Sequence, residues 1–117
     1  MTGAILILTQ MPDHASAQSL ARSLVEARLA ACVSIGAPVE SLYHWRGQIE
    51  TAQEVPVVVK TRAERYPEVE AAIRAQHPYE LPEILAVPVV DELASVSLSL
   101  WADERGYTKL QLNLLGM

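Results

Sequence analysis

The sequence predicts a single α+β domain whose strands and helices follow the order β-α-β-β-α-β. Three observations lead to this prediction. Apolar residues alternate with a period of two in the stretches around 33–45 and 49–60, which is typical of β-strands. Residues 14–29 and 64–76 instead place apolar side chains three and four positions apart, as amphipathic helices do. No linker, repeat or low-complexity tract divides the 117 residues, which suffice for one core but not for two.

The first strand is expected at Ala4–Thr9, an almost wholly apolar run of the kind that is covered on both faces. A turn follows, in which Asp13 can accept hydrogen bonds from the free backbone N–H groups of the next helix. That helix should begin at His14 and end near Leu29, because the segment contains neither Gly nor Pro. Its inward stripe would consist of Ala17, Leu20, Ala21, Leu24 and Arg28.

The middle of the chain predicts a β-hairpin with unusually long arms. Its turn lies at Arg46 and Gly47, and bulges or edge positions are expected at Gly36, Pro38 and Pro56. Each arm of about 14 residues would reach roughly 45 Å. The arms therefore either bend strongly or project and pack on neighbouring copies. Five apolar residues share one parity and are expected on one face: Val33, Ile35, Val39, Tyr43 and Trp45.

The second half predicts a helix over 64–76 with Tyr66, Val69 and Ile73 on one face, ended by Pro78. A strand over 84–90 contains Pro88, which indicates an edge or a bend. A third, shorter helix is expected around residues 93–101. The tail 107–117 alternates again and can add an edge strand. This order is the split βαβ or ferredoxin-like arrangement, with both long helices on one face of an antiparallel sheet.

Composition excludes several classes of protein. The net charge is −5, and the nine Lys and Arg residues form no cluster, which argues against nucleic acid or an anionic membrane as partner. No apolar run approaches the roughly 18 residues of a membrane span, and the opening residues lack the basic region of a signal peptide. The single cysteine, Cys32, cannot form an intramolecular disulfide, so a cytoplasmic protein is expected. Cys32 itself is predicted to be buried and chemically unreactive.

The segment QHPYELPE at 76–83 concentrates polar and ring-bearing side chains between two prolines. Pro78 and Pro82 fix their own φ angles and bias the preceding residues toward extended conformations. The segment is therefore expected to be a stiff loop. It is either a rigid connector to the next strand or a loop that presents His77 and Glu83 for chemistry.

Four stretches in the same order and spacing resemble the CutA family, the divalent-cation tolerance proteins, and the resemblance covers about residues 4–103. The stretches are LeuAlaAlaCysVal at 29–33, SerLeuTyrHisTrpArgGly at 41–47, GluValProValValValLysThr at 54–61 and HisProTyrGluLeuProGlu at 77–83. The resemblance implies a ferredoxin-like fold, a tight homotrimer like that of the PII signalling proteins, and a link to tolerance of copper and other divalent metals.

The resemblance also suggests site residues. His77 and Glu83 match the loop signature and offer nitrogen and oxygen donors for Cu(II) or another divalent cation, with no obligatory cofactor. The expected ligand-binding or interface residues are Tyr43, Trp45, Lys60 and Tyr79. Lys60 is expected either to pair with Glu83 or to contact an anion.

Two positions depart from the family pattern. Thr9 stands where some members have a cysteine proposed as a copper ligand, and Leu98 stands where many have a tyrosine. The missing thiolate argues against a Cu(I) site, because soft sulfur ligands favour that ion.

No catalytic signature such as GxSxG, a P-loop, CxxC or HExxH is present, so no enzyme is expected. Three functions stay open. The first is a trimeric protein of metal tolerance that binds metal weakly. The second is a PII-like module that binds a small molecule in clefts between subunits. The third is a purely structural or interaction trimer.

Overall fold

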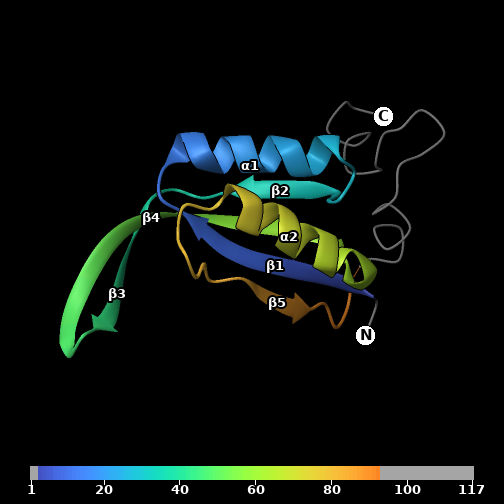
Figure 1. Ribbon diagram of the computed structural model, residues 1–117. Helices are drawn as coiled ribbons and strands as arrows, with labels where there is room; N and C mark the ends of the chain where they lie inside the picture. Colours follow the sequence, from blue (N-terminus) through green and yellow to red (C-terminus); the bar gives the residue numbers. More distant parts are fainter. Residues whose placement is uncertain (1–2, 93–117) are drawn as a thin grey trace.

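The computed structural model describes residues 3–92. These residues form a five-stranded sheet in the order β2-β4-β1-β5, with β3 paired to β4 outside that path, and every pairing is antiparallel (Figure 1). The strands are β1 (Ala4–Met11), β2 (Cys32–Ile35), β3 (Val39–Trp45), β4 (Gln48–Arg62) and β5 (Leu85–Pro88). Strand β5 lies at an edge, where the expected Pro88 is tolerated.

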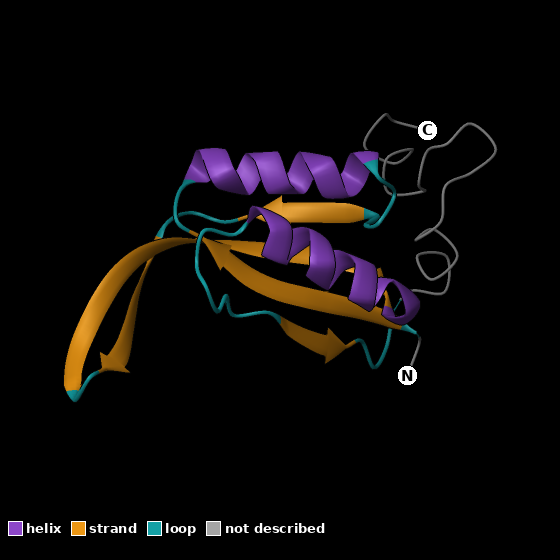
Figure 2. Cartoon of the chain, in the orientation of Figure 1, coloured by secondary structure: helices purple, strands orange, loops and turns teal. Residues whose placement is uncertain are grey.

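Two helices, α1 (His14–Glu26) and α2 (Tyr66–Gln76), lie on the same face of the sheet (Figure 2). A short 3₁₀ turn, η1 (Ala63–Arg65), precedes α2. This arrangement confirms the predicted ferredoxin-like α+β class. No helix within residues 3–92 is long and apolar enough to cross a membrane. The predicted third helix, Leu98 and the tail 107–117 lie outside the described residues.

Helix α1 begins where the sequence predicts but ends earlier. The carboxylate of Asp13 accepts a hydrogen bond from the backbone N–H of Ser16 at 2.7 Å, so Asp13 caps the helix as expected. The prediction that the helix reaches Leu29 with Arg28 on its inner stripe is wrong. Arg28 is exposed and has a φ of 60°, a left-handed conformation that an α-helix cannot contain.

The core lies between the sheet and the two helices. Alternate residues of β1 and β4 point toward the helices and are buried, because side chains of a strand alternate between its faces. The largest fully buried side chains are Ile7, Met11, Leu20, Leu24, Ile73, Val57, Val59 and Val69.

The opposite side of the sheet is uncovered within the described residues. Apart from Ala4 and Arg62, which the registers place at one end of this side, ten side chains lie on it, and all ten are half-buried or exposed. We call this surface the open face. It consists of Leu6, Leu8, Gln10, Cys32, Ser34, Pro56, Val58, Lys60, Leu85 and Val87.

A bulge separates β2 from β3, at the position that Gly36 and Pro38 indicated. Ile35 lies opposite Val57, whereas Val39 lies opposite Glu54, so residues 36–38 face only residues 55 and 56. One extra residue moves every later side chain to the other face. The prediction that Tyr43 and Trp45 share a face with Val33 and Ile35 is therefore wrong, because the parity argument ignored the extra residue.

Beyond the bulge, β3 and the first half of β4 form an arm that curves away from the helices (Figure 1). At its tip Arg46 and Gly47 have φ angles of 51° and 78°, as the two central residues of a type I′ turn require. The arm has exposed apolar side chains on both sides. Trp45 is 57% exposed on one side, and Leu42 and Ile49 are 64% and 66% exposed on the other.

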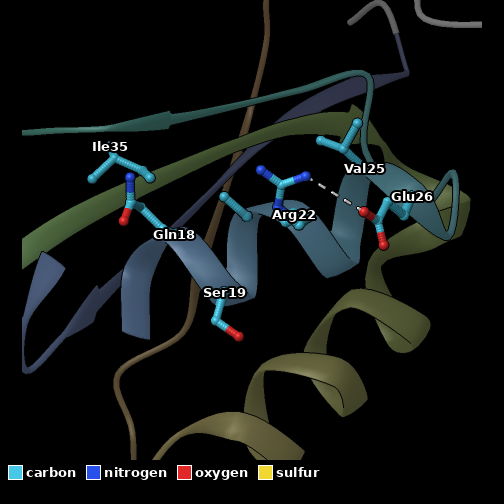
Figure 3. Close-up of a pocket in the computed structure, with 7 residues that line it drawn as sticks. Gln18, Ser19, Arg22, Val25, Glu26 and Ile35 are labelled. Carbon is cyan, nitrogen blue, oxygen red and sulfur yellow. Dashed lines mark ion pairs between the residues drawn. The ribbon is translucent and has the colours of Figure 1, made fainter. Parts of the chain in front are cut away.

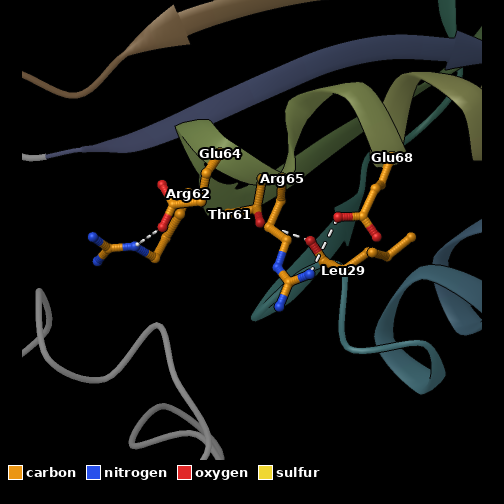
Figure 4. A network of polar contacts seen from close by, with 6 residues as sticks. All are labelled: Leu29, Thr61, Arg62, Glu64, Arg65 and Glu68. Carbon is orange, nitrogen blue, oxygen red and sulfur yellow. Dashed lines mark hydrogen bonds and ion pairs between the residues drawn. The ribbon is translucent and has the colours of Figure 1, made fainter.

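Polar contacts hold the other end of β4 where the chain enters α2 (Figure 4). The hydroxyl of Thr61 donates to the backbone oxygen of Leu29 at 2.7 Å. Arg62 pairs with Glu64 at 3.0 Å, and Arg65 pairs with Glu68 at 3.2 Å. Because these ion pairs are partly exposed, they contribute little to stability, and the buried Thr61 contact matters more.

Candidate functional site

The predicted loop 77–83 is attached to the end of β1 by His77. His77 is 8% exposed, and its Nε2 lies 2.6 Å from the backbone oxygen of Gln10. Its Nδ1 accepts the backbone N–H of Tyr79 at 3.2 Å. Since Nδ1 accepts, Nε2 carries the proton and donates to Gln10. Both ring nitrogens therefore have hydrogen-bond partners within the chain.

Thr9 attaches the far end of the same loop. Its hydroxyl donates to the backbone oxygen of Glu83 at 2.8 Å, and the residue is only 2% exposed. Adjacent residues of β1, Thr9 and Gln10, thus hold both ends of the loop. The hydroxyl group of Thr9 therefore fixes the end of the loop at Glu83.

The loop brings the two predicted metal ligands onto one short segment but does not surround a cation site. Glu83 is exposed, whereas His77 is buried. Across residues 3–92, no three His, Cys, Asp or Glu side chains are grouped so that they can hold a metal ion. Binding of a cation by either nitrogen of His77 must replace one of its hydrogen bonds.

An aromatic cluster adjoins His77. The rings of His77 and Tyr79 lie 4.5 Å apart between centroids. Burial raises the pKa of Tyr79, and the neighbouring carboxylate of Glu54 raises it further. Tyr43 makes a smaller contribution in the same direction. The structure thus brings Tyr43 and Tyr79 together, as candidate residues of one site. Glu54 was missed as a site residue, because only the fold places this residue of β4 beside the loop.

Trp45 and Lys60 lie away from this cluster. Trp45 is at the tip of the arm, where the guanidinium of Arg46 lies 5.4 Å from its ring centroid. Lys60 lies opposite Leu6 and Cys32 on the open face, toward the other end of β1 from Thr9. No ion pair among the described residues joins Lys60 to Glu83.

Cys32 shares the open face with Lys60 and is half-buried. The prediction that Cys32 is buried is therefore wrong for the single chain, because the open face has no cover within the described residues.

A shallow groove of about 480 Å³ lies elsewhere, along α1 (Figure 3). Arg22 and Glu26 form an exposed ion pair at 3.8 Å on its wall. None of the residues that sequence analysis singled out as site candidates lines it. Its lining residues are Gln18, Ser19, Ala21, Arg22, Val25, Glu26 and Ile35.

Comparison with known proteins shows which family the sequence is similar to. The sequence model of the family described as CutA1 divalent ion tolerance protein matches residues 5–104. A relative from Pectobacterium atrosepticum, named divalent-cation tolerance protein CutA, is 43% identical over 86 residues, which cover 74% of this chain and 78% of the relative.

Solved structures show the same fold. The crystal structure of CutA1 from Shewanella sp. SIB1 superposes with a TM-score of 0.77 at 42% identity, covering 79% of this chain and 86% of that one. The protein from Archaeoglobus fulgidus, described as a periplasmic divalent cation tolerance protein CutA, has a TM-score of 0.75 at 38% identity. That match covers 78% of this chain and 88% of the other.

Proposed function

Because the chain belongs to the CutA1 family of divalent ion tolerance proteins, we propose that it acts in tolerance of divalent cations, copper included, as a non-catalytic homotrimer. The names of its relatives, which are divalent-cation tolerance proteins, support the role in tolerance. The observation that best supports an assembly is the projecting arm. Its apolar residues are exposed on both sides, and strand β3 has a free outer edge within the described residues. Such a surface needs a protein partner.

The homotrimer is tested by the mass of the full chain in solution. Light scattering at low micromolar concentration should give three times the chain mass of 12.8 kDa. A stable monomer or dimer would contradict the trimer.

For the metal, we propose weak binding of a divalent cation such as Cu(II) by His77 and Glu83, completed by water or neighbouring oxygen donors. Imidazole nitrogen and carboxylate oxygen suit this ion. The affinity should be weak, because a cation must displace one of the two hydrogen bonds of the buried imidazole. One such hydrogen bond contributes about 0.5–1.5 kcal/mol. Calorimetry with Cu(II) at neutral pH tests this proposal. The His77→Ala variant should lose the heat of binding, and the control His14→Ala, which changes an exposed residue of α1, should retain it.

A second candidate function is the binding of a small molecule. The cluster of Tyr43, Tyr79 and Glu54 beside His77 supports it. Two phenol rings and a carboxylate suit a ligand with a flat or cationic group. Mass spectrometry of protein purified under native conditions would detect such a molecule. Loss of the bound mass in Tyr79→Ala but not in His14→Ala would favour this candidate over metal binding.

We also propose a cytoplasmic location, on the support of the single unpaired cysteine. The relative described as periplasmic makes the test necessary. Fractionation of cells that express the untagged chain decides it, because a periplasmic protein is released by osmotic shock and a cytoplasmic one is retained.

A further inference from the structure

The aromatic cluster beside His77 is built from three segments that are far apart in the sequence. Tyr43 lies on β3, Glu54 lies on β4, and Tyr79 lies in the loop after α2. Opposite residues of paired strands share a side, so Tyr43 and Glu54 lie on the same side of the arm. The fold therefore gathers two phenol rings and a carboxylate where the loop meets the base of the arm.

The side chain of Tyr79 is held in place from two directions. Its ring lies against the imidazole of His77, with the centroids 4.5 Å apart, and its hydroxyl donates a hydrogen bond to Glu54. The loop that carries it is fixed at both ends by its contacts with Thr9 and Gln10. A ligand of this cluster therefore has little conformational freedom of the protein to remove, and such preorganisation favours binding.

The carboxylate of Glu54 has no basic partner within residues 3–92, because the ion pairs there do not include it. A similar phenol–carboxylate pair on α2 differs in this respect. There the hydroxyl of Tyr66 contacts Glu70, but Arg74 pairs with Glu70 at 3.8 Å. Glu54 is half-buried, and an unpaired charge that is partly removed from water is unfavourable. The cluster therefore attracts a cation.

The chemistry of the cluster suits an organic cation better than a metal ion. Glu50, a second carboxylate on this side of the arm, is four residues from Glu54 along β4, or about 13 Å at 3.3 Å per residue. Two carboxylates at that separation cannot coordinate one ion. Aromatic ring faces attract large organic cations, and Tyr43 and Tyr79 are 45% and 42% exposed, so ring surface is available.

The small number of acceptors indicates which kind of ammonium fits. A primary ammonium carries three N–H donors that need acceptors in place of water, whereas a quaternary ammonium carries none. The quaternary group needs only ring surface and a counter-charge. Resting on the small-molecule function proposed above, we propose that this cluster binds the methylated ammonium group of a small organic molecule. The rings of Tyr43 and Tyr79 contact its methyl groups, and Glu54 is its counter-ion.

Two ligands of the same shape test the role of the charge. Choline and its uncharged carbon isostere, 3,3-dimethyl-1-butanol, are titrated into the full wild-type chain by calorimetry in phosphate buffer, because amine buffers would compete. Choline should bind at least about tenfold more tightly than the isostere. EDTA should leave the affinity for choline unchanged, since no metal ion takes part. Equal affinities for the two ligands, or no binding of choline, would overturn the proposal.

Matched variants test the location of the site. Tyr43→Leu and Glu54→Gln should each weaken choline binding about fivefold or more, whereas Tyr43→Phe keeps the ring and should keep the affinity. Glu40→Gln is the control, because Glu40 is an exposed glutamate on the other side of the same arm. Equal losses in Glu54→Gln and Glu40→Gln would overturn the proposed location. Far-UV circular dichroism checks folding, and if Tyr43→Leu fails to fold, Glu54→Gln and the pair of ligands still decide.

The outcomes separate this proposal from the small-molecule function on which it rests. Native mass spectrometry can find a bound molecule that lacks an ammonium group and is lost in Tyr79→Ala. That result would leave the small-molecule function standing and overturn the ammonium ligand. If no molecule copurifies and choline does not bind, both are overturned. Choline binding with the expected order of the variants supports both.

Discussion

The imidazole of His77 lies 2.6 Å from the backbone oxygen of Gln10, across a separation of 67 residues in the chain. The contact ties the loop of the second half of the chain to the first strand. The other ring nitrogen, Nδ1, accepts the backbone N–H of Tyr79 within the loop. The ring of His77 therefore bridges the loop and the strand.

Replacing His77 should therefore destabilise the protein whether or not metal is present. His77→Ala leaves the carbonyl of Gln10 without its donor, and we expect a loss of about 1–3 kcal/mol in the free energy of unfolding. Urea denaturation at fixed protein concentration measures it, since assembly makes stability concentration-dependent. His14→Ala, at an exposed position, should change it by less than about 0.5 kcal/mol. Equal effects of the two variants would refute the structural role.

Thr9 should control the order of the loop through its hydroxyl group. Thr9→Val keeps the shape but removes the donor to the carbonyl of Glu83, at a cost of about 1 kcal/mol. Amide exchange across residues 77–83 should then become faster. Thr9→Ser retains the hydroxyl and should keep the loop protected. Unchanged exchange in Thr9→Val would show that this bond does not hold the loop.

The bulge at Gly36 should tolerate no side chain while Pro56 is present. A Cβ at Gly36 would lie 2.8 Å from Cγ of Pro56, closer than atoms pack. Gly36→Ala should destabilise by about 1–3 kcal/mol, as overpacking does. The same change in a Pro56→Ala background should cost clearly less, and a double-mutant cycle measures the difference. Additive effects of the two substitutions would exclude the clash.

Asp13 should make part of the stability dependent on pH. The hydrogen bond from the backbone N–H of Ser16 holds the pKa of Asp13 below its ordinary value, with further lowering by the hydroxyl of Ser16. Because the folded pKa is the lower one, the stabilisation is complete above the unfolded pKa of about 3.9 and is lost as pH falls through the folded pKa.

Thermal unfolding between about pH 6 and pH 3 measures this dependence. Asp13→Asn also caps helices but does not titrate, so its Tm should fall less on acidification than that of the wild type. Asp13→Ala should have a lower Tm than the wild type at pH 6. Parallel curves for the wild type and Asp13→Asn would contradict a contribution from this carboxylate.

The elements of this protein were predictable from its sequence because their signals are local. Periods of two and of three to four residues identify β1, β4, α1 and α2, and Asp13 and Pro78 mark a helix start and a helix end. The turn at Arg46 and Gly47 and the bulge near Gly36 were also visible, since glycine and proline limit the backbone where they occur.

The tertiary structure alone decided which side chains meet. The residue added at the bulge sends Tyr43 and Trp45 to the face opposite the helices, and parity along the chain cannot reveal it. Likewise, His77 reads as a possible ligand in sequence, but Gln10, far away in the chain, occupies its Nε2. The register of strands and the packing of loops depend on contacts between distant segments, and no local pattern records these.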